Sequence, residues 1–171
     1  MNLYFAVQNT VPLHAANKRS DFGFVMQFIS DIVSQVDLKM SKVKVFEYNE
    51  REVVEDAVFN LSATNNKRNN RNRQMKQLRK STKSRPTIDR PKIKPVVEKL
   101  NSIMVEEKNT LMSGSTNVVV LFITNIPGDL QSVTSEYLAN EIEELNRKAF
   151  VIVVFIHPLS HDELRTVPYR L

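Results

Sequence analysis

The sequence of 171 residues contains no cysteine, no tryptophan and only three glycines. Without cysteine the chain has no disulfide, no thiolate metal site and no cysteine nucleophile, although this does not decide its compartment, because secreted domains of this size can fold on their core alone. Gly23, Gly114 and Gly128 are too few for a dinucleotide fingerprint or a phosphate-binding loop. We therefore expect no nucleotide site.

Long apolar runs are also missing. No stretch approaches the roughly 20 apolar residues that a membrane-spanning helix requires, and strand-like residues follow Met1 in place of a signal peptide. We expect an intracellular protein or a part of a longer chain. With 42% hydrophobic residues, the length suits one α/β domain over residues 1–171.

Acidic residues are absent between Ala57 and Ile88, where basic residues alternate with asparagines. We call residues 62–86 the basic insert. It is either a solvated loop or a site for a polyanion such as a sulfated glycan, an acidic matrix protein or nucleic acid. Phe59 is the only aromatic residue between Tyr48 and its end, so a base-stacking platform is missing and glycan ranks ahead of nucleic acid. The candidate polyanion-binding residues are Lys67, Arg68, Arg71, Arg73, Lys76, Arg79, Lys80, Lys83 and Arg85.

Apolar residues recur at helical spacing in three segments. They predict helices over 21–38, from about 94 to 104, and over 138–145. Ser160 to Glu163 has the spacing of a capping box and predicts a further helix.

Strands are predicted between these helices. The apolar runs 118–123 and 150–156 do not alternate, which is typical of parallel strands that helices cover on both faces. Further strands are predicted at 3–7, 43–48 and 51–59, and the last two are expected to form an antiparallel edge hairpin around the intervening two-residue turn. The order predicts an α/β fold with a doubly wound, mainly parallel sheet, right-handed crossovers and helices on both faces.

These segments, in this order, resemble the von Willebrand factor A-type (vWA) domain, also called the integrin I-like domain. The stretches that carry the resemblance are the first strand with its Gln-Asn-Thr-Val-Pro loop, the helix from Asp21 to Leu38, VKVFEYN, TIDRPKIKPVVEKL, VVVLFITNIPGD and FVIVVFIHPLSHDELRTV. The resemblance spans nearly the whole chain and implies a Rossmann-like fold. It also implies that the last strand and terminal helix of the family are truncated or missing after Arg165.

In that family an Asp-x-Ser-x-Ser loop, a threonine from a second loop and an aspartate in a Thr-Asp-Gly turn hold Mg²⁺ or Mn²⁺ at a metal-ion-dependent adhesion site. The resemblance places these ligands on Gln8, Thr10, Pro12, Thr87 and Asn125. Only two hydroxyls remain, and hard cations usually require carboxylates, so we expect a degenerate site, no bound metal and no cofactor. Asp129 is the one nearby acid that could substitute. The alternative is that all of these are ordinary loop residues.

No catalytic residue is assigned, and we do not expect an enzyme. His157 and His161 lie near acidic residues, but a strand end that leads into a helix cap explains them better than a metal or acid/base cluster. Asn60 begins an Asn-Leu-Ser sequon and is a glycosylation candidate, which favours a secreted location.

Two functions from different classes follow. The favoured one is a non-enzymatic adhesion or assembly module of an extracellular matrix or filament protein, similar to the tandem A-type domains of collagen VI. Its partners would be matrix proteins or neighbouring A-type domains, with a heparin-like glycan bound by the basic insert. The alternative is an intracellular A-type scaffold in a nucleic-acid-associated complex, similar to Ku, with the basic insert near nucleic acid.

Overall fold

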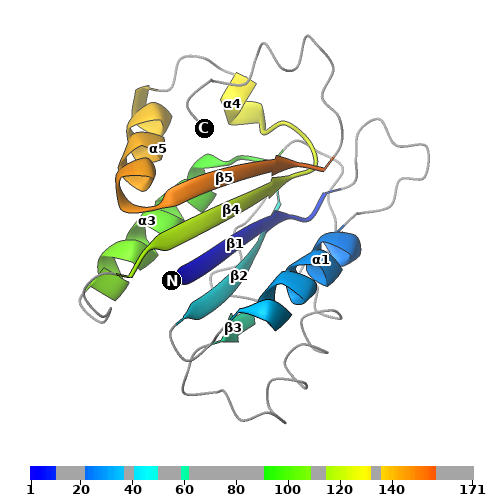
Figure 1. Ribbon diagram of the computed structural model, residues 1–171. Coiled ribbons are helices and arrows are strands. Elements are labelled where there is room, and N and C mark those ends of the chain that lie inside the picture. The colour runs from blue at the N-terminus through cyan, green and yellow to red at the C-terminus, as the bar shows by residue number, and fades with distance from the viewer. Residues whose placement is uncertain are drawn as a thin grey trace, which may run out of the picture.

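A computed structural model of the chain contains a five-stranded sheet with helices on both faces (Figure 1). The structure describes residues 1–10, 22–36, 41–49, 59–61, 91–108, 115–131 and 136–156. The strands are β1 (Asn2–Gln8), β2 (Lys42–Tyr48), β3 (Phe59–Leu61), β4 (Asn117–Ile123) and β5 (Phe150–Phe155). The helices are α1 (Phe22–Gln35), α3 (Lys94–Lys108), α4 (Gly128–Gln131) and α5 (Glu136–Lys148).

The strand order is β3-β2-β1-β4-β5, with β1, β2, β4 and β5 parallel. In the centre, Leu3 of β1 lies opposite Val43 of β2 on one side and Val118 of β4 on the other. After β1 the chain leaves toward β2 and later returns to the opposite side of β1 as β4. The doubly wound, mainly parallel sheet is therefore confirmed, and the carboxyl ends of β1 and β4 meet at its switch point.

The antiparallel edge differs from the predicted hairpin. β3 pairs antiparallel with β2, and Val45 lies opposite Phe59. A turn confined to Asn49 and Glu50 would instead place Val45 opposite Val54, because each step along one strand of a hairpin is a step back along the other. The predicted two-residue turn is thus wrong. Residues 50–58, which carry most of the predicted second strand, lie outside the described part of the chain.

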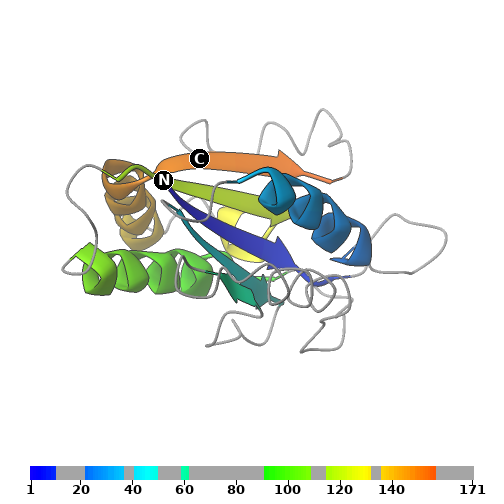
Figure 2. The same cartoon turned by 60° about the horizontal axis from the view of Figure 1, so that its bottom comes forward.

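Alternation along the strands divides the core into two layers. Leu3, Phe5 and Val7 of β1 pack on the α1 side, whereas Tyr4 and Ala6 pack on the side of α3 and α5. Figure 2 shows α1 and α3 on opposite sides of the sheet. Residues 3–7 of β1 place apolar or aromatic side chains on both faces, and all of them are buried, as the central position of the strand requires.

The helices begin and end close to the predicted positions. α3 starts at Lys94, so Pro95 lies in the first turn, where its missing N–H donor is not needed. Asn101 of α3 donates from Nδ2 to the carbonyl of Glu141 in α5 at 2.9 Å, which joins the two helices. The helix predicted after Ser160 lies outside the described residues. None of the described helices is long and apolar enough to cross a membrane.

Large apolar side chains are exposed on the α1 side. We call Phe24 and Phe28 of α1, with Phe150 and Ile152 of β5, the α1–β5 patch. Phe24 is 74% exposed and Phe150 66%. The Phe28 ring stands edge-on to the Phe122 ring of β4, with centroids 6.1 Å apart, so this side of α1 faces β4. On the same face of the sheet, Phe150 and Ile152 lie opposite Val118 and Val120 of β4.

Candidate functional site

Most of the buried polar side chains in the described part of the chain lie at the carboxyl ends of β1, β2 and β4. They are Gln8, Asn9, Thr10, Glu47, Asn49, Thr124 and Asn125. Figure 1 shows the ends of β1 and β4 side by side. Ligands of open α/β sheets bind outside this edge, so these residues form the candidate site.

Gln8 joins β1 to the segment after β4. Its Oε1 accepts hydrogen bonds from the backbone N–H groups of Thr124 at 2.5 Å and Asn125 at 2.6 Å. Its Nε2 donates to the carbonyl oxygen of Asn125 at 2.9 Å. The reversed amide orientation would set an NH₂ group against two N–H donors, so the network itself fixes the orientation. Gln8 is 1% exposed, and this amide is part of the protein interior.

Thr10 and Asn125 extend the same network. Asn125 Nδ2 donates to Thr10 Oγ1 at 3.2 Å, and Thr10 Oγ1 donates to Gln8 Oε1 at 3.3 Å. The structure thus brings three of the five positions from the sequence analysis into mutual contact. Pro12 and Thr87 lie outside the described residues.

These three side chains do not fit a divalent cation. Mg²⁺ and Mn²⁺ require several oxygen ligands and usually a carboxylate, whereas the cluster offers two amides and one hydroxyl. Gln8 Oε1 and Thr10 Oγ1 already accept hydrogen bonds from neighbouring N–H groups. Nowhere in the described ranges do three or more His, Asp or Glu side chains gather into a group that could hold a metal. We derive no metal chemistry from this site, and the absence of a bound metal stays a prediction.

Asp129, the acid considered as a substitute ligand, has a different position. Its Oδ1 accepts the backbone N–H of Ile93 and its Oδ2 that of Lys94, both at 2.9 Å. These are the N–H groups at the start of α3, which have no partner within a helix. Asp129 therefore caps α3 from α4. Both of its oxygens are directed toward the helix end.

Glu47 is an acidic residue of this edge that the sequence analysis missed. It is fully buried, and its Oε1 accepts a hydrogen bond from Asn9 Nδ2 at 2.6 Å. It shares the α1 side of β2 with Val43 and Val45, whereas Gln8 follows Ala6 on the α3 side of β1. Glu47 therefore does not complete the Gln8 cluster. The sequence could have indicated its burial, because Glu47 continues the alternate positions of Val43 and Val45 in the predicted strand 43–48.

Tyr48 links the strands on both sides of β1. Its hydroxyl donates to the carbonyl oxygen of Phe122 in β4 at 3.2 Å. Burial raises the pKa of Tyr48 far above its ordinary value, and the negative charge of Asp129 raises this pKa further. The hydroxyl stays protonated at physiological pH, so Tyr48 is a structural donor and not an acid/base group.

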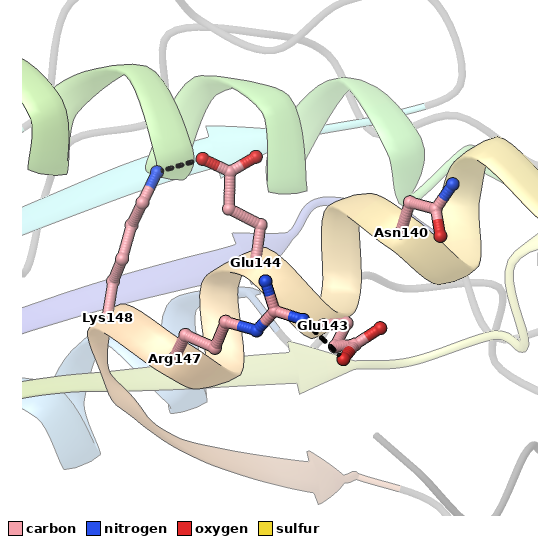
Figure 3. A pocket seen from close by; sticks show the side chains of 5 residues that line it. All are labelled: Asn140, Glu143, Glu144, Arg147 and Lys148. Atoms are coloured by element: carbon pink, nitrogen blue, oxygen red, sulfur yellow. Dashed lines mark hydrogen bonds and ion pairs between the residues drawn. The ribbon is translucent and has the colours of Figure 1, made fainter.

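A hollow of about 490 Å³ lies along α5 and is lined by Asn140 and four charged side chains of that helix (Figure 3). Arg147 pairs with Glu143 at 2.7 Å, and Lys148 pairs with Glu144. Such exposed pairs four residues apart contribute only a few tenths of a kcal/mol and are common on solvated helices. This surface presents paired charges and no nucleophile among its lining residues.

The remaining predicted sites stay predictions. The basic insert with its nine basic residues, together with His157 and His161, lies outside the described part of the chain. Asn60, the sequon asparagine, lies within β3 opposite Lys44.

Comparison with known proteins shows similarity at the level of the fold. No protein-family model and no curated protein matches the chain. The manganese-loaded TRAP protein of Plasmodium vivax superposes with a TM-score of 0.57 at 13% identity, over 96% of this chain and 61% of that one. Proximal thread matrix protein 1 (PTMP1) from the mussel byssus superposes with a TM-score of 0.63 at 12% identity, over 98% of this chain and 41% of that one.

Both neighbours contain a vWA domain. The chain spans about three fifths of the length of the TRAP chain and two fifths of the PTMP1 chain. At this level of identity the likeness carries the fold and no particular ligand.

Proposed function

We propose that this chain, which has the fold of a vWA-type domain, is a non-enzymatic module for protein–protein contacts in adhesion or assembly. We further propose that its contacts do not depend on a divalent cation. The fold supports the first part, since one of its neighbours is by name a matrix protein. The strand-end cluster supports the second part.

The observation that carries the proposal is the side-chain content of the carboxyl edge. In a metal-dependent A-type domain, the cation at this edge contributes directly to binding a partner. Here the equivalent positions Gln8, Thr10 and Asn125 bond to each other or to nearby backbone and are buried. A partner of this chain would therefore bind elsewhere on the surface.

The α1–β5 patch is the surface that we propose for this contact. Taking about 200 Å² for a whole aromatic side chain, the four exposed side chains present on the order of 400 Å² of apolar surface. A stable interface buries about 800 Å² on each partner, so the patch would supply the apolar centre and its polar surroundings the rim. The proposed partner is a neighbouring A-type domain, for which a second copy of this chain serves as the probe.

The proposal places the module outside the cell, as a part of a longer secreted chain in a collagen VI-like array. The sequon at Asn60 supports this location. The basic insert would add a heparin-like glycan as a second ligand. Elution from heparin at higher salt than from duplex DNA would support this reading, whereas tighter binding to DNA would favour the intracellular, Ku-like scaffold.

Sedimentation equilibrium in Mg²⁺ and in chelator tests the main proposal. We expect concentration-dependent association that is equal in both buffers and is lost in a variant with Phe24→Ser and Phe150→Ser. The control Val105→Ser also changes an exposed apolar residue, but on α3 at the opposite side of the sheet, and should associate like the wild type. A chain that stays monomeric at all concentrations would refute the patch as the contact surface. Association that requires Mg²⁺ would refute the independence from cations.

A further inference from the structure

We propose that the Gln8 carboxamide itself closes the carboxyl edge of the sheet, at a position where the resemblance places a cation ligand of metal-dependent A-type domains. The inference rests on the metal independence of the proposed function and names the group responsible for it. In this view the site has not simply lost its ligands. A neutral amide cross-links β1 to the segment after β4.

The backbone after β4 supports this directly. Two successive N–H groups, those of Thr124 and Asn125, point at the same oxygen, Gln8 Oε1. Successive N–H groups that converge on one point present positive partial charge there and bind an acceptor or an anion. A cation in that place would face two hydrogens. The conformation of this segment therefore requires an acceptor oxygen at this point, which the Gln8 amide supplies.

At the other end of the side-chain amide, the structure requires a hydrogen-bond donor. Gln8 Nε2 lies 2.9 Å from the carbonyl oxygen of Asn125, so an oxygen in place of this nitrogen would meet another oxygen at hydrogen-bond distance. Glutamine satisfies both requirements, because it carries an acceptor and a donor on one planar group. A carboxylate satisfies only the first one, unless it is protonated.

The substitution Gln8→Glu tests this reading, because it changes the donor atom and keeps the size of the side chain. At pH 7 we expect the unfolding midpoint to fall by roughly 5–10 °C, as for a buried polar group without its partner. Protonation lets the introduced carboxyl donate to the Asn125 carbonyl, so the folded state raises the pKa of that carboxyl. The difference from the wild type should therefore be small near pH 4 and grow as the pH rises.

Other titratable groups belong to this region, namely Glu47 and Tyr48, which lie opposite Val7 and Gln8, and Asp129, whose charge acts on Tyr48. The wild type contains all of them, so the difference between the two proteins isolates the new group. Gln27→Glu is the matched control, because Gln27 is an exposed amide that donates to Asp31 at 3.0 Å. We expect its midpoint to stay within about 2 °C of the wild type. A Gln8→Glu variant that behaves like this control at every pH would overturn the proposal.

Amide hydrogen exchange of the wild-type protein gives a test that needs no variant. If Gln8 holds the edge, the N–H groups of Thr124 and Asn125 are protected in chelator, and Mg²⁺ does not change their rates. Rapid exchange in chelator that Mg²⁺ slows would overturn the inference. Protection in chelator combined with Mg²⁺-dependent self-association would leave the inference standing and refute the proposed function, so the two failures are distinguishable.

Discussion

Replacing Asp129 by alanine removes the cap of α3 and should destabilise the whole domain. Asp129 is the acceptor for the backbone N–H groups of both Ile93 and Lys94, at 2.9 Å each. Loss of an N-cap costs about 1 kcal/mol, and a partly buried donor left without a partner adds to this, so we expect about 2 kcal/mol in total. Asp129→Asn keeps one acceptor oxygen and should lie between alanine and the wild type.

Urea denaturation in chelator measures this effect, and calorimetry should show a lower midpoint by about 4–8 °C for a domain of this size. Asp31→Ala is the control, because Asp31 also accepts a side-chain hydrogen bond but lies exposed on α1. Its cost should stay within about 0.5 kcal/mol. Equal costs for the two variants would refute the capping role. A cost at Asp129 that appears only in Mg²⁺ would show that this residue binds a metal.

Two further substitutions test the core around the site. Tyr48→Phe removes the hydrogen bond to the Phe122 carbonyl and should cost about 1 kcal/mol by urea denaturation. Because burial raises the pKa of Tyr48 above its unfolded value of about 10, ionisation favours the unfolded chain, and wild-type stability should fall more steeply than that of Tyr48→Phe as the pH rises beyond this value. Ile29→Ala, in the fully buried stripe of α1, should cost about 2–5 kcal/mol, and a cost below about 1 kcal/mol would contradict the packing of α1 on β1.

Most of the sheet could be predicted from local patterns. Continuous apolar runs identified β4 and β5 to within one residue. The expected cover on both faces does not hold for β5, an edge strand whose Phe150 and Ile152 are exposed. Helical spacing likewise located α1. The predicted two-residue turn was wrong. It was placed at Asn49-Glu50 because strand-like residues follow this pair directly, but turn propensity alone does not fix the register of the two strands.

The site was predictable in place but not in chemistry. The family resemblance assigned Gln8 and Asn125 to the same site, and in the structure the two residues are hydrogen-bonded. The two N–H groups that converge on Gln8 depend on the backbone after β4, which the sequence pattern does not specify. The role of Asp129 was also out of reach, since its partner Ile93 lies 36 residues away in the chain. Contacts of this kind depend on tertiary structure and leave no local signal.

The most direct test of the account is the thermal unfolding midpoint in millimolar Mg²⁺ or Mn²⁺ compared with the same buffer containing chelator. A cation present at a hundred times its Kd would add about 2.7 kcal/mol to the stability, which corresponds to a shift of roughly 5–10 °C. An edge closed by the Gln8 amide predicts equal midpoints in the two buffers. A midpoint raised by several degrees in Mg²⁺ or Mn²⁺ would contradict the account, since a cation would then be holding the strand ends.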